Sequence, residues 1–196
     1  KRQFYDNLVV AVGNRIGVNA RAERLNWARF FFHGVCIALL LPVYAGIAAL
    51  AGIEFFAGRF AFALVAGLVA VIAMLGYTTG FRRIELIMPI NYFGCLRYAQ
   101  AVGPATRRAD YRYSERELAA RASPPLASIL TTLLGLAIAL WTGLGAGVWL
   151  PFVVTALMFT AASFPIKTWG PLATSVVEVI FSAGILIALA RAAGAG

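Results

Sequence analysis

The strongest constraint on this chain is a set of long apolar runs that carry almost no charge. Residues 60 to 80, for example, contain no Asp, Glu, Lys or Arg. The hydrocarbon core of a bilayer is about 30 Å thick, and a helix needs about 20 apolar residues to cross it. Soluble domains carry about 25% charged residues, whereas this chain has 13% and is 61% hydrophobic. The sequence therefore predicts an integral membrane protein whose apolar surface faces lipid.

Five windows of the sequence are candidates for spanning helices, and they predict an all-α bundle of about five transmembrane helices. In chain order they are residues 34–52, 60–80, 126–147, 148–164 and 172–190. The fourth window, Val148 to Phe164, is short and contains Pro151. It predicts either a tight hairpin with the third helix or a re-entrant element. If it does not span, the bundle has four transmembrane helices and the C-terminus changes sides.

Lysine and arginine are concentrated on one side of the predicted topology. Six of them precede the first window and eight lie between the second and third windows. Such clusters mark cytoplasmic segments, so the N-terminus is expected in the cytoplasm and, with five spans, the C-terminus across the membrane in the periplasm or outside the cell. The alanine- and arginine-rich composition with short loops is typical of a bacterial inner membrane, which predicts a plasma membrane location.

These assignments divide the chain into five predicted regions. A cytoplasmic amphipathic and juxtamembrane segment precedes a first transmembrane hairpin. A basic cytoplasmic loop follows, then three further transmembrane helices and a short tail. The corresponding residues are 1–33, 34–80, 81–124, 125–191 and 192–196.

The cytoplasmic segments contain three predicted elements of their own. Apolar residues at four-residue spacing predict an amphipathic N-terminal helix on the headgroups or on a partner, and they are Phe4, Leu8, Val12 and Ile16. The stretch from Ile84 to Leu96 is too short to span and contains Pro89, which predicts an interfacial or re-entrant segment. The capping-box pattern that begins at Ser114 predicts a short helix in the cytoplasmic loop.

One carboxylate falls inside a predicted span. Glu178 lies about seven residues into the fifth window, where a charged group is costly and rarely faces lipid. Ser175 and Ser182 share its helix face, being three residues before and four residues after it, and Thr174 is close on the chain. One interpretation is an ion or proton site. The other is a hydrogen bond or ion pair that places the helix in the bundle or against a partner subunit.

No cofactor and no metal site are predicted from the sequence. His33 is the single histidine, so bis-histidine haem ligation within one chain is impossible, and no His, Cys and carboxylate cluster has the spacing of a zinc or di-iron centre. A lone imidazole can still ligate a pigment or share a haem with another chain. The alternative is an interfacial histidine between headgroups and lipid. Walker A, Rossmann, G-x-S-x-G, H-E-x-x-H and C-x-x-C motifs are all missing from the sequence.

Small residues recur at four-residue spacing in two of the predicted helices. In lipid, such faces allow two helix backbones to approach closely and to gain packing contacts. The positions are Gly76 and Gly80 in the second helix, with Gly135, Ala139, Gly143 and Gly147 in the third. They predict helix packing, either within the chain or with another chain.

The arginines of the cytoplasmic loop predict contact with lipid headgroups or with a partner. A well-placed basic residue attracts anionic lipid by about 1 kcal/mol. The residues concerned are Arg82, Arg83, Arg107, Arg108 and Arg112. They adjoin apolar runs and do not form a basic face with interleaved stacking aromatics, so no nucleic-acid partner is expected.

The favoured functional hypothesis is a non-catalytic, multi-spanning subunit of a larger membrane complex of the transport, secretion or energy-transducing type. Membrane lipid and other membrane subunits are the expected partners, in a homo- or hetero-oligomer. A small oligomeric transporter or channel component that uses Glu178 is the alternative. A third hypothesis is a lipid-acting membrane enzyme, for which the nearest candidate residues are Tyr111, Arg112, Tyr113 and Glu115.

Overall fold

The computed structural model describes residues 8–9, 12–86, 89–92, 95–98, 101–102, 125–163 and 166–194. The described elements belong to two compact units. The first unit contains residues 1–36 and 73–127, and the second contains residues 37–72 and 128–196. Several predictions lie outside the described residues, namely those on Phe4, Arg107, Arg108 and Arg112, the loop helix at Ser114 and the enzyme candidates Tyr111 to Glu115.

Three helices are long and apolar enough to cross a membrane, judged by length and composition. They are Arg59–Gly80, Leu126–Ala146 and Ser175–Gly194, and they coincide with the second, third and fifth windows of the sequence. Helix α2 (Ala20–Gly34) passes the same test only together with the helical residues Cys36–Leu50, to which it is bent by 54°. The described residues thus contain three such helices, or four if this bent pair is one span and not a re-entrant loop. Helices of this kind are expected of a membrane protein.

The first predicted span differs from the single helix expected over residues 34–52. Helix α2 begins earlier because Asn19 caps it: the Asn19 side-chain oxygen accepts hydrogen bonds from the backbone N–H groups of Arg21 and Ala22, at 2.9 and 3.0 Å. A 3-10 turn, η1 (Cys36–Leu39), separates α2 from α3 (Leu40–Leu50). Pro42 then lies in the first turn of α3, where its missing N–H leaves no intrahelical hydrogen bond unmade.

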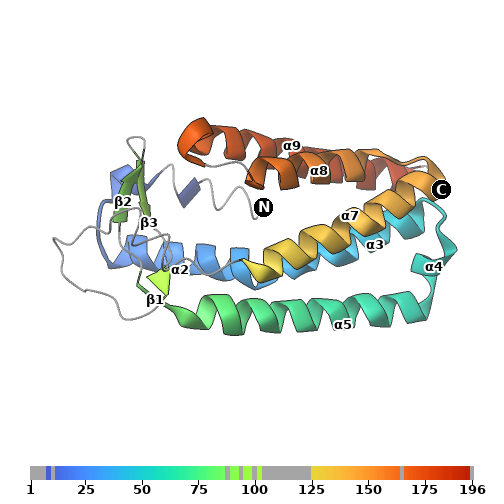
Figure 1. Ribbon diagram of the computed structural model, residues 1–196, viewed down its shortest axis with the longest axis horizontal. Helices are drawn as coiled ribbons and strands as arrows, with labels where there is room; N and C mark the ends of the chain where they lie inside the picture. The colour runs from blue at the N-terminus through green and yellow to red at the C-terminus, as the bar shows by residue number, and fades with distance from the viewer. Residues whose placement is uncertain are drawn as a thin grey trace. The chain divides into compact units, whose positions relative to one another are not determined.

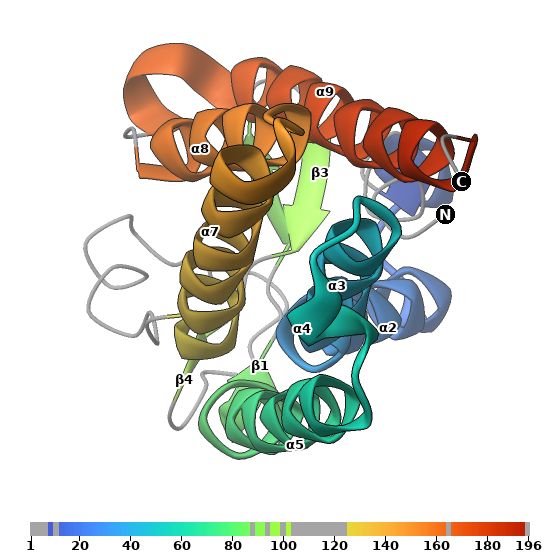
Figure 2. The ribbon, with the colours of Figure 1, turned by 90° about the vertical axis from the view of Figure 1, so that its right-hand side faces the viewer.

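Several helices of the second unit begin or finish at the same end of that unit. After α3 come α4 (Glu54–Ala57), α5 (Arg59–Leu75), α7 (Leu126–Ala146), α8 (Leu150–Ser163) and α9 (Ile166–Gly194). Helices α8 and α9 lie side by side, and α9 also packs on α3 (Figures 1 and 2). Helices α3, α7 and α9 all finish where α8 begins, so α8 runs opposite to the other three. We call this the α4 end of the second unit.

Helix α8 corresponds to the doubtful fourth window. Its 14 residues make a helix about 21 Å long at 1.5 Å per residue, which is shorter than the hydrocarbon core. Gly147, with φ +72°, ends α7, and its N–H donates to the carbonyl of Gly143 at 3.0 Å. The predicted hairpin partner was α7, whereas the structure packs α8 along α9.

The core of the second unit is formed mainly by α3 and α9, with α7 and α8 each adding a residue. Its buried members are Tyr44, Ile47, Ala139, Val154, Phe181, Ile185, Ala188 and Ala192. Small residues on α9 allow close packing, since a Cβ atom at Gly184 would lie 2.5 Å from a methyl of Val154. Helix α9 starts at Ile166, six residues before the predicted start at Leu172.

In the first unit, α2 packs against the segment that follows α5. This segment consists of a π-helical stretch, η2 (Gly76–Gly80), and a 3-10 turn, η3 (Phe81–Arg83). The ring of Phe81 contacts Trp27 and Phe31 edge to face, each at 5.3 Å between ring centroids. Aromatic packing therefore holds these two segments together.

Two polar side chains of α2 are buried beside this aromatic cluster. Asn26 and Arg29 are 5% and 6% exposed. An Arg29 guanidinium N–H donates to the Asn26 side-chain oxygen at 3.3 Å, and the guanidinium carbon lies 5.2 Å from the centre of the Phe30 ring. Arg29 was predicted only as a contributor to the cytoplasmic charge, and the structure places it inside the packing of α2.

Four short strands follow η3 and depart from the all-α prediction. Strand β1 (Ile84–Leu86) pairs with β4 (Ala101–Val102), and β2 (Pro89–Tyr92) pairs with β3 (Cys95–Tyr98), both antiparallel. Pro89 is the first residue of its strand, a position where the missing N–H is tolerated. Part of this stretch was predicted to be an interfacial or re-entrant segment. The strands were not predicted because a short apolar run does not by itself distinguish a strand from a helix.

The amphipathic N-terminal helix is described in part, with helical residues 8–9 and 12–16. Its buried face is shifted by one position from the predicted face, since Val9 is 5% exposed and Leu8 is 43% exposed. Ile16, which belongs to the predicted apolar face, packs against the core of the first unit. Gly17, with φ +71°, ends the helix.

Candidate functional site

The interior of the second unit contains a polar contact between distant parts of the chain. The Tyr44 hydroxyl of α3 lies 2.5 Å from the Thr155 hydroxyl of α8, and the two residues are 3% and 1% exposed. Thr155 also donates to the carbonyl of Pro151 at 2.6 Å. Because a threonine hydroxyl has one hydrogen, Tyr44 is the donor to Thr155. The three groups form a chain of hydrogen bonds from α3 into the first turn of α8.

The ring of Tyr44 also fills a space that α7 leaves open. A Cβ atom at Gly135 would lie 2.6 Å from the Tyr44 ring, which is closer than carbon atoms approach without displacement. Tyr44 therefore contacts α7 through its ring and α8 through its hydroxyl. One side chain of α3 therefore contacts two further helices.

The small-residue face predicted on α7 lies against this interior. Gly135, Ala139 and Gly143 are buried, whereas Gly147 is exposed and follows the helix end. A Cβ atom at Gly143 would lie 2.7 Å from the Trp149 ring. The same face carries Thr131, which is 1% exposed and whose hydroxyl has no hydrogen-bond partner among the described residues.

Gly76 and Gly80, the two packing glycines predicted in the second window, have different surroundings. A Cβ atom at Gly76 would lie 2.0 Å from the carbonyl oxygen of Gly34, so the two backbones meet directly. Gly80 has no described residue within 4 Å of its Cβ position. The close approach inside the first unit therefore involves Gly76 and Gly34.

Glu178, the acid predicted inside a span, belongs to α9. Glu178 is half-buried, as are Ser175 and Ser182, and the Ser182 hydroxyl donates to the backbone carbonyl of Glu178 at 2.9 Å. This bond satisfies Ser182 through its own helix, in the i to i−4 pattern that serine often adopts. Thr174 belongs to the same helix. The carboxylate lies on a half-buried face of α9 with polar neighbours one turn to either side.

The remaining predicted site residues lie in the first unit. His33 is exposed in the last turn of α2. Arg82 is exposed, and Arg83 ends the 3-10 turn η3. Among the described residues no group of three or more His, Cys, Asp or Glu side chains is arranged to hold a metal ion.

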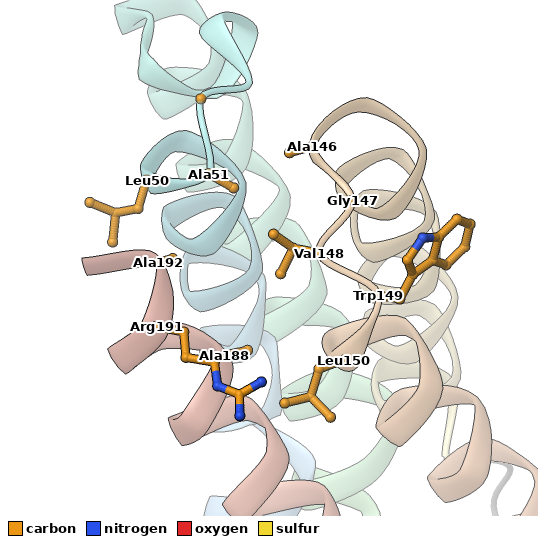
Figure 3. A pocket seen from close by; sticks show the side chains of 11 residues that line it. Leu50, Ala51, Ala146, Gly147, Val148, Trp149, Leu150, Ala188, Arg191 and Ala192 are labelled. Atoms are coloured by element: carbon orange, nitrogen blue, oxygen red, sulfur yellow. The ribbon is translucent and has the colours of Figure 1, made fainter. Parts of the chain in front are cut away.

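A hollow of about 540 Å³ opens at the α4 end of the second unit. It lies between the ends of α3 and α9 and the turn that joins α7 to α8 (Figure 3). Its lining residues are Leu50, Ala51, Gly52, Ala146, Gly147, Val148, Trp149, Leu150, Ala188, Arg191 and Ala192. Arg191 is the one charged side chain among them.

Aromatic side chains gather near the same end. The Phe55 ring of α4 stacks on Trp141 of α7 with centroids 5.3 Å apart, and Phe56 meets Trp141 edge to face at 5.4 Å. Trp141 is 48% exposed. Aromatic side chains at this level are typical of the boundary between lipid and water.

Comparison with protein families, with curated proteins and with solved structures gave no match.

The sequence did not predict the two residues that form the interhelical hydrogen bond inside the second unit. Tyr44 and Thr155 are separated by 111 positions, so no local pattern joins them. A signal was present, because a tyrosine and a threonine in otherwise apolar windows need hydrogen-bond partners in lipid. The hollow around Arg191 forms where three helix ends meet. No residue spacing along the chain predicts which helix ends come together.

Proposed function

We propose that this chain is a non-catalytic, multi-spanning subunit of a larger membrane assembly, with its N-terminus in the cytoplasm and its C-terminus across a bacterial inner membrane. The observation that carries the proposal is the hydrogen bonding of buried polar groups inside the second unit. Tyr44 of α3 donates to Thr155 of α8, and Thr155 donates within α8 to the carbonyl of Pro151, which supports a scaffolding role for this interior. Such hydrogen bonds position helices in lipid.

The exposed apolar surface of α5 supports the proposal that partners or lipid surround the bundle. Phe62 and Val71 are 78% and 66% exposed, and their nine-residue separation places them on opposite sides of the helix. Only 22% of its most apolar window is buried. A helix with so little packing inside its own chain has apolar surface left to cover on several sides.

A photo-crosslinking amino acid at position 62 or 71 tests the proposal in native membranes. We expect one of the two positions to give an adduct with another polypeptide of defined mass, while the opposite position gives lipid adducts. The purified complex should also be larger than the 21.0 kDa chain with its detergent. Lipid adducts alone at both positions, together with a monomer that is active by itself, would contradict the proposal.

A transporter or channel component that uses Glu178 is the second candidate. The observation in its favour is a half-buried carboxylate on a candidate span, with Ser175 and Ser182 on the same face. The test is ion flux through proteoliposomes that contain the Glu178→Gln variant. Glu54→Gln is the matched control, because Glu54 is exposed in α4, outside the candidate spans. A flux lost in the first variant and kept in the second would favour transport, and equal flux in both would reject a role for Glu178.

A further inference from the structure

The hollow at the α4 end combines apolar walls with a single positive charge. Leu50, Val148 and Leu150 supply large apolar side chains, and four alanines leave the central space open. Its volume of about 540 Å³ is within the range of sites that hold small organic molecules. Such a lining suits a ligand that is partly apolar and carries negative charge.

Arg191 is placed to meet that charge. It lies in the last turn of α9, is exposed, and extends across the space between α9 and the start of α8 (Figure 3). No described residue forms an ion pair with its guanidinium. A guanidinium offers a planar set of N–H donors that matches a phosphate group.

Two of the helix ends around the hollow are partly capped. Helix C-termini carry partial negative charge, but three carbonyls in the last turn of α3 accept hydrogen bonds: Ala51, Gly52 and Ile53 donate to Ile47, Ala49 and Ala48 at 2.9 to 3.0 Å. The carbonyl of Gly143 in α7 likewise accepts from Gly147. The start of α8 contributes partial positive charge from the same wall.

We propose that this hollow binds an acidic phospholipid of the adjoining leaflet, with the lipid phosphate on Arg191 and the start of one acyl chain against Leu50 and Leu150. The exposed aromatic cluster around Trp141 places the hollow at the level of the headgroups. The inference rests on the membrane embedding included in the proposed function, and it does not depend on partner subunits.

The test is native mass spectrometry of the purified, delipidated chain titrated with phosphatidylglycerol or phosphatidylcholine. We expect phosphatidylglycerol to bind more tightly, and Arg191→Gln to weaken its binding about tenfold, as expected for the loss of a charged hydrogen bond. Arg59→Gln is the matched control. It removes an equal charge at the exposed first residue of α5, near α4, and Arg59 does not line the hollow.

A second variant tests the apolar part of the site. Ala146→Leu keeps the charge and fills part of the hollow, so it should also weaken phosphatidylglycerol binding while the thermal unfolding midpoint stays unchanged. Three results would overturn the proposal: equal losses in the Arg191 and Arg59 variants, equal binding of both lipids, or displacement of the lipid by an equal concentration of inorganic phosphate. If lipid binds as expected and no partner crosslinks form, only the subunit proposal fails.

Discussion

The hydroxyl of Tyr44 lies 2.5 Å from the hydroxyl of Thr155, and both side chains are almost completely buried. The ring of the same tyrosine occupies the space beside Gly135. In lipid, apolar contact alone gives little preference for one helix arrangement over another, so close packing and interhelical hydrogen bonds select it. Tyr44 supplies both, through its ring beside Gly135 and its hydroxyl on Thr155.

Tyr44→Phe should lower the free energy of unfolding by about 1 kcal/mol, because it removes one interhelical hydrogen bond and keeps the ring. Unfolding in mixed detergent and SDS micelles, followed by circular dichroism, measures the change. Tyr77→Phe is the control, since Tyr77 is 42% exposed. A double-mutant cycle with Thr155→Val should give a coupling energy of about 0.6 kcal/mol, and a coupling of zero would show that the bond is not formed in solution.

Gly135→Ala should destabilise the second unit by roughly 1–3 kcal/mol, because the new methyl group overlaps the buried Tyr44 ring. Gly46→Ala is a matched control, being also a helical glycine, with none of the described residues within 4 Å of its Cβ position. There the substitution should be neutral or stabilising, since alanine favours helix. The same unfolding measurement compares the two, and equal effects would refute the close contact between α7 and Tyr44.

Gly76→Ala should disturb the first unit more than Gly80→Ala. The Cβ atom at position 76 would lie 2.0 Å from the Gly34 carbonyl oxygen, whereas no part of the described chain comes within 4 Å of a Cβ atom at position 80. We expect a loss of roughly 2 kcal/mol or more for the first variant. Fluorescence of Trp27, which packs on Phe81 in this unit, reports the change once the other tryptophans are replaced. Identical spectra and stabilities for the two variants would contradict the assignment.

Single-cysteine variants test whether the short helix α8 crosses the membrane. Ala193 and Glu54 lie near the α4 end of the second unit, while Ser163 is at the other end of α8. Cysteines at positions 54 and 193 should react with a membrane-impermeant maleimide from the same side. A cysteine at position 163 should react only from the opposite side. If position 163 reacts from the same side as position 54 while position 193 reacts from the opposite side, α8 is re-entrant and the four-span topology holds.

The apolar helices could be recognised from the sequence because their length and composition reflect the solvent around them. The windows at 60–80, 126–147 and 172–190 reappear as helices of spanning length, since a stretch that faces lipid must satisfy its own backbone and present apolar side chains. The weak fourth window is also a short helix in the structure. The break before Leu40 and the strands after Arg83 were not foreseen, because they depend on local caps and on pairing between segments.

The sequence by itself determined which segments are apolar, where positive charge gathers and which positions are small enough for close packing. The tertiary structure decided which small positions are used: Gly135 meets Tyr44 and Gly76 meets Gly34, whereas a Cβ atom at Gly80 or Gly147 would have no described residue within 4 Å. It also joined Tyr44 to Thr155 and placed Arg191 beside the start of α8. The physical reason is that a small residue or a buried hydroxyl only permits a contact, and the choice of partner follows from how the helices pack.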